Sequence, residues 1–361
     1  GTEKEKGIMS KAQELIKNEG LVGMIITDPY NMRHISGFRG GEGALYISAT
    51  QQVLITDSRY TEQAEKESDF TIVQEHRGHT REQIFAECLA KEEGTLAIGY
   101  EDQSLLCCQF DKMAKAMPVK DWVPMGGKVD ALRRIKTAEE IEYLAQAEHI
   151  GDVAFSKILD FLRPGVSELE VAAELEYQMK KAGAEDLGFN TIIASGLNSS
   201  MPHAIPGKKK LEAGDFVTMD FGCKYEGYCS DMTRTVVLGK ANDKQKEIYN
   251  VVLEAQLAGL AAVKAGKTGK EVDKVARDVI TKAGYGEYFG HSLGHSVGLF
   301  IHEKPGLAPS DETVLQAGMI ETVEPGIYVP GFGGVRIEDM VLVTEEGCRN
   351  LASSPKELIE L

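Results

Sequence analysis

The chain has 361 residues, enough for two compact domains, and its 42% hydrophobic and 27% charged residues are typical of globular proteins. No apolar run approaches the roughly 20 residues that span a bilayer, which excludes a transmembrane protein. Acidic residues outnumber basic residues by 56 to 40, so the average surface repels nucleic acids and anionic membranes.

The N-terminal residues Gly1–Ser10 are charged and lack the apolar stretch of a secretory signal. The six cysteines include no Cys-x-x-Cys pair and are too few for a disulfide framework, so we expect reduced thiols. Both observations favour a cytoplasmic protein, and the acidic surface predicts one that binds neither nucleic acid nor membranes.

Short apolar runs alternate with helical stretches from about Lys11 to Val123. A helix is predicted at Ala12–Asn18, and strands are predicted at Leu21–Thr27, Val53–Thr56, Phe70–Val73 and Thr95–Ile98. Proline and glycine interrupt this pattern within Trp122–Val129. We therefore predict an N-terminal α/β domain over residues 1–130.

Three helix starts follow this boundary. Each has the spacing of a capping box, in which a hydroxyl and a carboxylate accept hydrogen bonds from free backbone N–H groups: Thr137 with Glu140, Ser167 with Glu170, and Thr268 with Glu271. The second and third predicted helices both end in Lys-Ala-Gly, and their matching positions lie 101 residues apart. This offset indicates a weak internal duplication, although two similar helices would give the same signal.

Each half then continues into strand-rich sequence, at Asp215–Leu238 and at Met319–Thr344. Helices followed by strands, twice over, predict an α+β domain across residues 131–361.

The first strand-rich segment is a predicted hairpin that carries two aspartates. A two-residue turn at 225–226 or 226–227 would place Asp220 and Asp231 on one face, directly opposed or one diagonal apart. Like charges in that arrangement destabilise a sheet unless a shared cation compensates. Alternatively, one aspartate faces solvent or pairs with Arg234, and a three-residue turn would place the two on opposite faces.

Acids also interrupt the second strand-rich segment, at Glu324 and Glu338, and His291, His295 and His302 lie between the two segments. Two aspartates, two glutamates and one or more histidines in extended chain form a candidate metal-ligand set. Carboxylates with at most one imidazole suit Mn(II), with Co(II), Fe(II) or Zn(II) as alternatives. Four carboxylates balance two divalent ions, which together can activate a water and polarise a carbonyl.

A serine hydrolase is an alternative interpretation, because Gly290–Gly294 and Gly294–Gly298 both fit Gly-x-Ser-x-Gly. That motif requires a buried strand before the serine and a helix after it. Here a glycine-rich stretch precedes the serine, strand-forming residues follow it, and no histidine comes after His302. We therefore disfavour the serine hydrolase.

Five motifs, in this order and spacing, resemble the metallopeptidase family of aminopeptidase P and prolidase: Met219–Gly222, Ser230–Thr235, Gly294-His295, Val323–Gly326 and Arg336–Asp339. Asp28–Gly37 also resembles the creatinase-like N-terminal domain of that family. The resemblance covers nearly the whole chain and implies a pita-bread catalytic domain with internal pseudo-twofold symmetry. That symmetry would account for the 101-residue offset.

The resemblance also implies roles for individual residues. Asp220 would bind one metal ion, His295 and Glu324 would bind the other, and Asp231 and Glu338 would bridge the two. His203 matches a histidine that lies near the substrate, His291 and His302 match histidines that assist substrate binding or proton transfer, and Arg336 matches a substrate-contacting arginine. In the mechanism that we expect, Glu338 or a nearby histidine handles protons. Creatinase, a relative that works without metal, does not retain this ligand set, so its presence here favours a hydrolase.

Two departures from the family pattern concern the predicted pocket. Ser296 follows His295 where many relatives have glycine, and Phe300 stands where glutamate is commoner. The second change removes an acid and bears on substrate preference rather than on metal binding.

We therefore expect a metal-dependent exopeptidase, an Xaa-Pro aminopeptidase that removes the N-terminal residue preceding proline, with two divalent ions and a homodimeric assembly. The alternative is an Xaa-Pro dipeptidase (prolidase), which reads the free proline carboxylate of a dipeptide. A non-catalytic metal- or peptide-binding protein on the same fold is disfavoured, because such proteins have usually lost some metal ligands.

Overall fold

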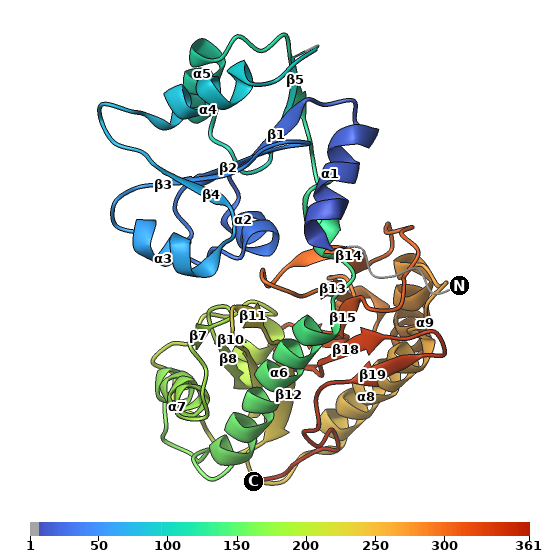
Figure 1. Ribbon diagram of the computed structural model, residues 1–361. Helices are drawn as coiled ribbons and strands as arrows, with labels where there is room; N and C mark the ends of the chain where they lie inside the picture. The colour runs from blue at the N-terminus through green and yellow to red at the C-terminus, as the bar shows by residue number, and fades with distance from the viewer. Residues whose placement is uncertain (1–6, 95) are drawn as a thin grey trace. The chain divides into compact units, whose positions relative to one another are not determined.

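The computed structural model describes residues 7–94 and 96–361, and the chain divides into two compact units after Arg133 (Figure 1). The N-terminal unit contains α1 (Ile8–Asn18), β1 (Gly23–Ile26), α2 (Pro29–Ser36), β2 (Ala44–Ser48), β3 (Gln52–Thr56), α3 (Thr61–Glu67), β4 (Thr71–Gln74), α4 (Arg81–Ala90), β5 (Ala97–Tyr100), α5 (Cys107–Ala116), β6 (Asp121–Pro124) and the 3₁₀ turn η1 (Asp130–Arg133).

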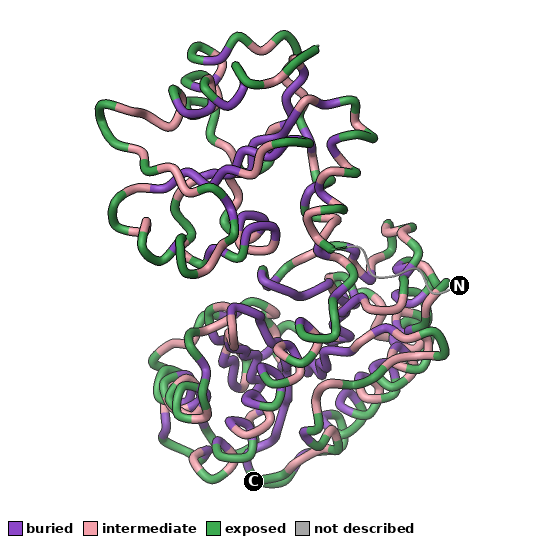
Figure 2. Tube along the Cα trace, viewed as in Figure 1, coloured by how far each residue is buried: buried purple, intermediate pink, exposed green. Residues whose placement is uncertain are grey.

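These strands form one sheet with the order β4-β3-β2-β1-β5-β6, in which β2 runs antiparallel to both of its neighbours. One face packs against α1, α2 and α3 through residues such as Ala12, Met32 and Ala64, and the other against α4 and α5 through Phe85 and Met113. The buried strands form the middle layer (Figure 2). The predicted α/β class is confirmed.

The predicted helix and strands of this unit fall on α1, β1, β3, β4 and β5, with Thr95 lying outside the described residues. The interpretation of Trp122–Val129 as an interruption is wrong at its start. Asp121–Pro124 forms β6, which pairs in parallel with β5. Pro124 is tolerated because β6 is an edge strand, so no neighbouring strand on its outer side needs the N–H that proline lacks.

The C-terminal unit has two halves, and in each of them a pair of helices is followed by strands. The first half contains α6 (Ala138–Ile158), α7 (Glu168–Lys181), β7 (Asp186–Leu187), β8 (Ile192–Ser195), η2 (Gly196–Ser200), β9 (Phe216–Phe221), β10 (Cys223–Tyr225), β11 (Tyr228–Cys229) and β12 (Met232–Val237). The second contains α8 (Asp243–Ala262), α9 (Gly269–Lys282), η3 (Gly286–Tyr288), β13 (Gly294–Ser296), β14 (Glu303–Leu307), β15 (Ile320–Val323), β16 (Gly326–Val329), β17 (Gly333–Arg336), β18 (Asp339–Val343) and β19 (Cys348–Asn350). A helix pair followed by strands, twice over, confirms the predicted α+β domain.

The three predicted helix starts are present. Thr137, Ser167 and Thr268 cap α6, α7 and α9, each accepting a hydrogen bond from the backbone N–H three residues later. The helices α7 and α9 have equal lengths of 14 residues and bounds 101 residues apart. The repeated start therefore reflects a repeated structural unit.

The aspartate-bearing hairpin has one of the two predicted registers. Thr233 lies opposite Asp220 and Tyr228 opposite Tyr225, so the turn is Glu226-Gly227. Both turn residues have positive φ, 49° and 80°, which suits the twist of a two-residue hairpin. Asp231 therefore lies on the same face as Thr233, one diagonal from Asp220.

Strand alternation gives this hairpin two distinct faces. Val217, Met219 and Phe221 pack into the core beneath α6 and α7, so Asp220 points to the opposite face. On that face the two halves of the unit meet, because Thr233 and Glu338 form an isolated antiparallel bridge. The register thus presents both aspartates to the second half.

Gly222 allows the hairpin to close tightly. A Cβ atom at this position would overlap the carbonyl oxygen of Ser230, which lies between β11 and β12 on the other arm of the hairpin. We expect Gly222→Ala to destabilise the protein by roughly 1–3 kcal/mol, because backbone must shift to relieve the overlap. Urea unfolding measures this, with Gly347→Ala as the control because a Cβ there meets no atom within 4 Å. Equal stability of the two variants would contradict the prediction.

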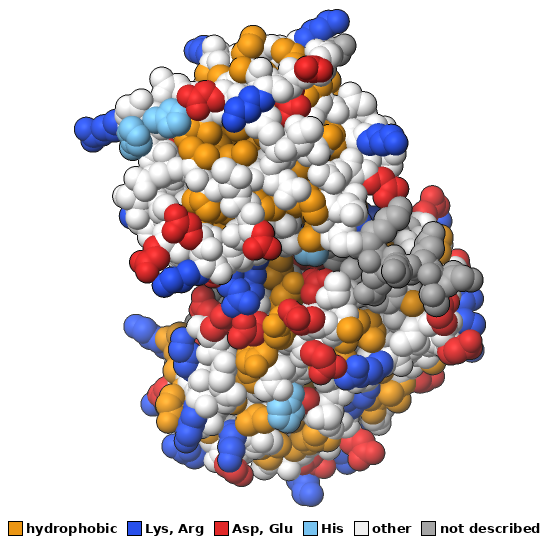
Figure 3. Space-filling view, viewed as in Figure 1, with side chains coloured by type: hydrophobic (Ala, Val, Ile, Leu, Met, Phe, Trp, Pro, Cys, Tyr) orange, Lys and Arg blue, Asp and Glu red, His pale blue; other side chains and the backbone are white. Residues whose placement is uncertain are grey.

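None of the helices within residues 7–94 and 96–361 has the length and apolar composition needed to cross a membrane. On the face drawn in Figure 3, acidic and basic side chains are interspersed on each unit.

Candidate active site

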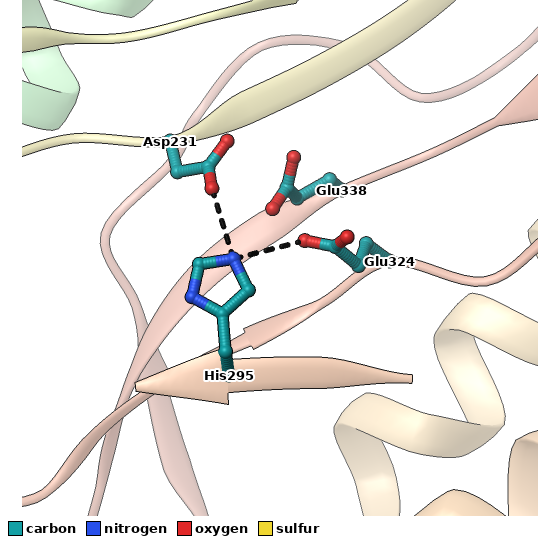
Figure 4. A group of neighbouring side chains, drawn as sticks. All are labelled: Asp231, His295, Glu324 and Glu338. Carbon is teal, nitrogen blue, oxygen red and sulfur yellow. Dashed lines mark ion pairs between the residues drawn. The ribbon is translucent and has the colours of Figure 1, made fainter. Parts of the chain in front are cut away.

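Four predicted metal ligands converge in the C-terminal unit (Figure 4). Asp231, His295, Glu324 and Glu338 each offer one ligand atom, and these atoms lie within 4.8 Å of one another. The His295 Nε2 atom is 3.2 Å from Asp231 Oδ2 and 3.6 Å from Glu324 Oε2. Three of the four lie at strand ends: Asp231 directly before β12, Glu324 directly after β15 and Glu338 directly before β18.

Asp220, the fifth predicted ligand, lies beside this group. Its carboxylate interacts with Asp231, and its Oδ2 atom accepts a hydrogen bond of 3.0 Å from Arg336 Nη2. The alternative in which an aspartate pairs with Arg234 is wrong. Arg234 lies on the opposite face of β12 and binds Asp339 at 2.7 Å, where both side chains are almost fully buried.

The carboxylates of the site lie close enough to repel one another, so a bound cation would stabilise their ionised forms. Burial, together with Asp231, raises the pKa of Asp220 and of Glu338 well above their ordinary values. Burial would also raise the pKa of Glu324, but its interactions with Glu338 and with the His295 imidazole hold it below its ordinary value. Among the described residues, Asp220 Oδ1, Asp231 Oδ1 and Glu338 Oε2 are buried without a hydrogen-bond partner. Buried, unpartnered carboxylate oxygens facing one another are what divalent cations bind, so the residues fit the predicted metals.

His295 is oriented for metal binding by the backbone around it. Its Nδ1 atom lies 2.9 Å from the carbonyl oxygen of Ser296, which only accepts, so Nδ1 carries a proton and Nε2 is the ring nitrogen left to bind a metal ion among the carboxylates. Its backbone N–H donates to Thr322 Oγ1 at 3.0 Å. Burial would lower the pKa of His295, but Asp231 and Glu324 raise it well above its ordinary value.

Glu338 is also held in place by a neighbour. The Thr233 hydroxyl donates to Glu338 Oε1 at 2.7 Å, which leaves Oε2 facing the ligand group. Sequence reasoning did not single out Thr233 for this role, although it lies within the quoted motif Ser230–Thr235.

A cavity of about 410 Å³ opens beside these ligands. Its lining includes three of the predicted metal ligands together with His203, His291 and Arg336. His302 packs against the His295 ring, with 4.5 Å between ring centroids. The structure therefore brings the nine predicted site residues into one region of the C-terminal unit.

A hydrogen-bonded chain crosses the cavity wall through Tyr328, which the sequence analysis missed. Arg336 Nη1 donates to Tyr328 Oη at 3.0 Å, and Tyr328 Oη lies 2.7 Å from His291 Nε2. Because His291 Nδ1 donates to the carbonyl oxygen of Ser292, its Nε2 accepts a hydrogen bond from the Tyr328 hydroxyl. Burial lowers the pKa of His291, which favours this neutral form. Both terminal nitrogens of Arg336 are thus engaged by protein groups.

The serine motif does not form a nucleophile elbow. Ser292 precedes the short strand β13, and no helix follows before β14. The disfavoured serine hydrolase lacks the strand-turn-helix geometry that it requires.

Comparison with known families agrees with this geometry. Residues 142–345 match the model of metallopeptidase family M24, and residues 9–135 match the creatinase/prolidase N-terminal domain. The chain belongs to metallopeptidase family M24. The predicted resemblance is confirmed, and so are the pita-bread catalytic domain and the creatinase-like N-terminal domain.

Individual relatives of this M24 peptidase match over nearly their whole length. A solved structure described as Xaa-Pro dipeptidase from Bacillus anthracis is 47% identical with a TM-score of 0.94, covering 98% of this chain and 99% of that one. The Xaa-Pro dipeptidase of Pyrococcus furiosus is 40% identical over 97% of this chain and 99% of its own. The structure of an X-Pro aminopeptidase from Thermotoga maritima is 38% identical with a TM-score of 0.88, covering 95% and 98%.

Proposed function

We propose that this M24 peptidase is an Xaa-Pro dipeptidase that hydrolyses the bond between an N-terminal residue and a C-terminal proline. The observation that carries the proposal is the convergence of three carboxylates and one imidazole, with the Asp220 carboxylate beside them, next to a cavity lined by three histidines. The names of the relatives support the dipeptidase over the aminopeptidase. The similar proteins from Bacillus anthracis and Pyrococcus furiosus are named Xaa-Pro dipeptidases, so the dipeptidase replaces the aminopeptidase as the leading hypothesis.

The proposed metal site uses the five predicted ligands in their predicted roles. Asp220 would hold one divalent ion, His295 and Glu324 the other, and Asp231 and Glu338 both. When bound, the ions supply Lewis acidity for the scissile carbonyl and lower the pKa of the attacking water. Mn(II) remains the favoured ion on the chemistry of the donor set, and the cytoplasmic location and the homodimer remain predictions.

The remaining side chains would bind the substrate and move protons. Proline leaves no N–H on the scissile nitrogen, so recognition must come from the ring, the carboxylate and the residue before it. His203 and His291 line the cavity where those groups would lie. His302, against His295, and Glu338 are the candidates for proton transfer to the leaving nitrogen.

The proposal is tested with matched substrates. We expect Ala-Pro to be hydrolysed at least about tenfold faster, in kcat/KM, than Ala-Pro-Ala, and Ala-Ala to be a poor substrate. Activity should disappear after chelation and return with Mn(II). Faster hydrolysis of Ala-Pro-Ala would favour the aminopeptidase, and full activity after verified metal removal would contradict both.

A further inference from the structure

We propose that Glu168 is a positioning residue for His203, because one buried carboxylate fixes both ends of the loop segment that carries this histidine. The inference rests on the proposed function, in which His203 contacts the substrate. It assigns a role to a residue that lies outside every motif quoted for the family.

The Glu168 carboxylate bonds two distant points of the chain. Its Oε2 atom accepts hydrogen bonds of 2.8 Å from both the backbone N–H and the hydroxyl of Ser195. Its Oε1 atom accepts one of 3.2 Å from the backbone N–H of Gly207. Asn198 Nδ2 adds longer contacts of 3.3 and 3.4 Å. The segment from Ser195 to Gly207 is therefore closed by a single side chain.

We call the hydrogen bonds of Glu168 to Ser195, Asn198 and Gly207 the Glu168 clamp, and backbone N–H groups at the start of α7 add to it. Glu168 is the first residue of the helix, and its own N–H and that of Leu169 donate to the carbonyl oxygens of Lys209 and Gly207 at 3.0 and 3.1 Å. N–H groups in the first turn have no partner within the helix, so they are available for the loop. Glu168 is only 1% exposed, and a buried carboxylate is stable only when such donors surround it.

The closed segment presents His203 to the cavity. Pro202 and His203 line the cavity together with His291 and His295. Residues 201–207 form neither helix nor strand, so their backbone position depends on anchors outside the segment. A second anchor lies at Ser199, whose hydroxyl accepts from the N–H of Gly334 on β17, the strand that carries Arg336.

A double-mutant cycle separates positioning from simple support of the fold. We expect Glu168→Gln to lower kcat/KM for Ala-Pro about 10- to 100-fold. The amide NH₂ of the glutamine would face one of the N–H or O–H donors that the carboxylate now binds, so the loop that carries His203 would shift. A shift of about 1 Å in a substrate-contacting group has an effect of this size. In the His203→Ala background the same change should alter kcat/KM less than twofold. Fold-changes that multiply in the double variant would overturn the proposal.

Glu176→Gln is the matched control. Glu176 lies on the same helix and accepts a hydrogen bond of 2.9 Å from Thr191 Oγ1, outside the Ser195–Gly207 segment. We expect it to leave kcat/KM unchanged in both backgrounds. An effect of Glu176→Gln equal to that of Glu168→Gln would show that any carboxylate on α7 matters equally, and would overturn the assignment.

Hydrogen exchange tests the anchoring independently of turnover. In full-length protein with unchanged metal content, Glu168→Gln should accelerate amide exchange across residues 196–207 and not across α9. Should Glu168→Gln fail to fold, the same measurements on Glu168→Asp, which keeps the charge but shortens the reach, apply with the same expectations. Equal exchange rates across residues 196–207 in Glu168→Gln and the wild type would overturn the anchoring. If the variant exchanges faster there but the wild type cleaves no Xaa-Pro substrate, only the proposed function is overturned.

Discussion

Replacing Glu338 with glutamine should abolish peptide hydrolysis and release most of the bound metal. Glu338 is completely buried and contributes to the ligand group together with Asp231, His295 and Glu324. Its Oε1 atom is already oriented by Thr233, so the amide that replaces it would present either a neutral oxygen or an NH₂ group to a cation. We expect a loss in kcat/KM on the order of 10³-fold or more.

Metal analysis beside the activity assay checks this expectation. The matched control is Glu321→Gln. Like Glu338, Glu321 is a fully buried glutamate, and it lies on β15, three residues before Glu324. Burial raises the pKa of Glu321 well above its ordinary value, which favours the neutral carboxyl, and a neutral amide of the same size is a close substitute for that form. Retention of metal and activity by Glu338→Gln would contradict the assigned ligand set.

The fold and the ligand set were accessible from the sequence for different reasons. The helix starts follow from local chemistry, since a capping hydroxyl bonds an N–H only three residues away. The hairpin was predicted with two registers, and the turn Glu226-Gly227 has the chemistry that selects between them. It places glycine at the residue with φ of 80°, whereas the other register would require positive φ at Tyr225 as well.

Contacts between residues far apart in the sequence could not be predicted, because no local sequence pattern specifies them. The pairing of Arg234 with Asp339 joins residues 105 positions apart, although strand alternation already separates Arg234 from the face of Asp231. Tyr328 follows a quoted motif, but its partner His291 lies 37 residues earlier. Glu168 looked like an ordinary acid in the first turn of a helix, and its clamp depends on residues 27 and 39 positions away.

Loss of the Arg336 guanidinium should destabilise the metal-free protein more than the metal-loaded protein. Arg336 is 3% exposed, and its two terminal nitrogens bond Asp220 and Tyr328, each at 3.0 Å. In Arg336→Met, Asp220 would be left among like charges without its cationic partner. Breaking a buried ion pair in this way costs about 3–5 kcal/mol of unfolding free energy.

Divalent metal should restore part of this loss, because a cation bound by Asp220 supplies the missing positive charge. Urea unfolding with chelator and with Mn(II) measures both effects, and Arg349→Met, at an exposed position on β19, should change stability by less than about 0.5 kcal/mol. Arg336→Lys keeps the charge, so we expect it to retain most of the stability while kcat/KM falls, since a single ammonium lacks the planar, two-nitrogen geometry with which the guanidinium bonds Asp220 and Tyr328. A destabilisation of Arg336→Met that is equal with and without Mn(II) would show that the arginine and the metals do not share Asp220.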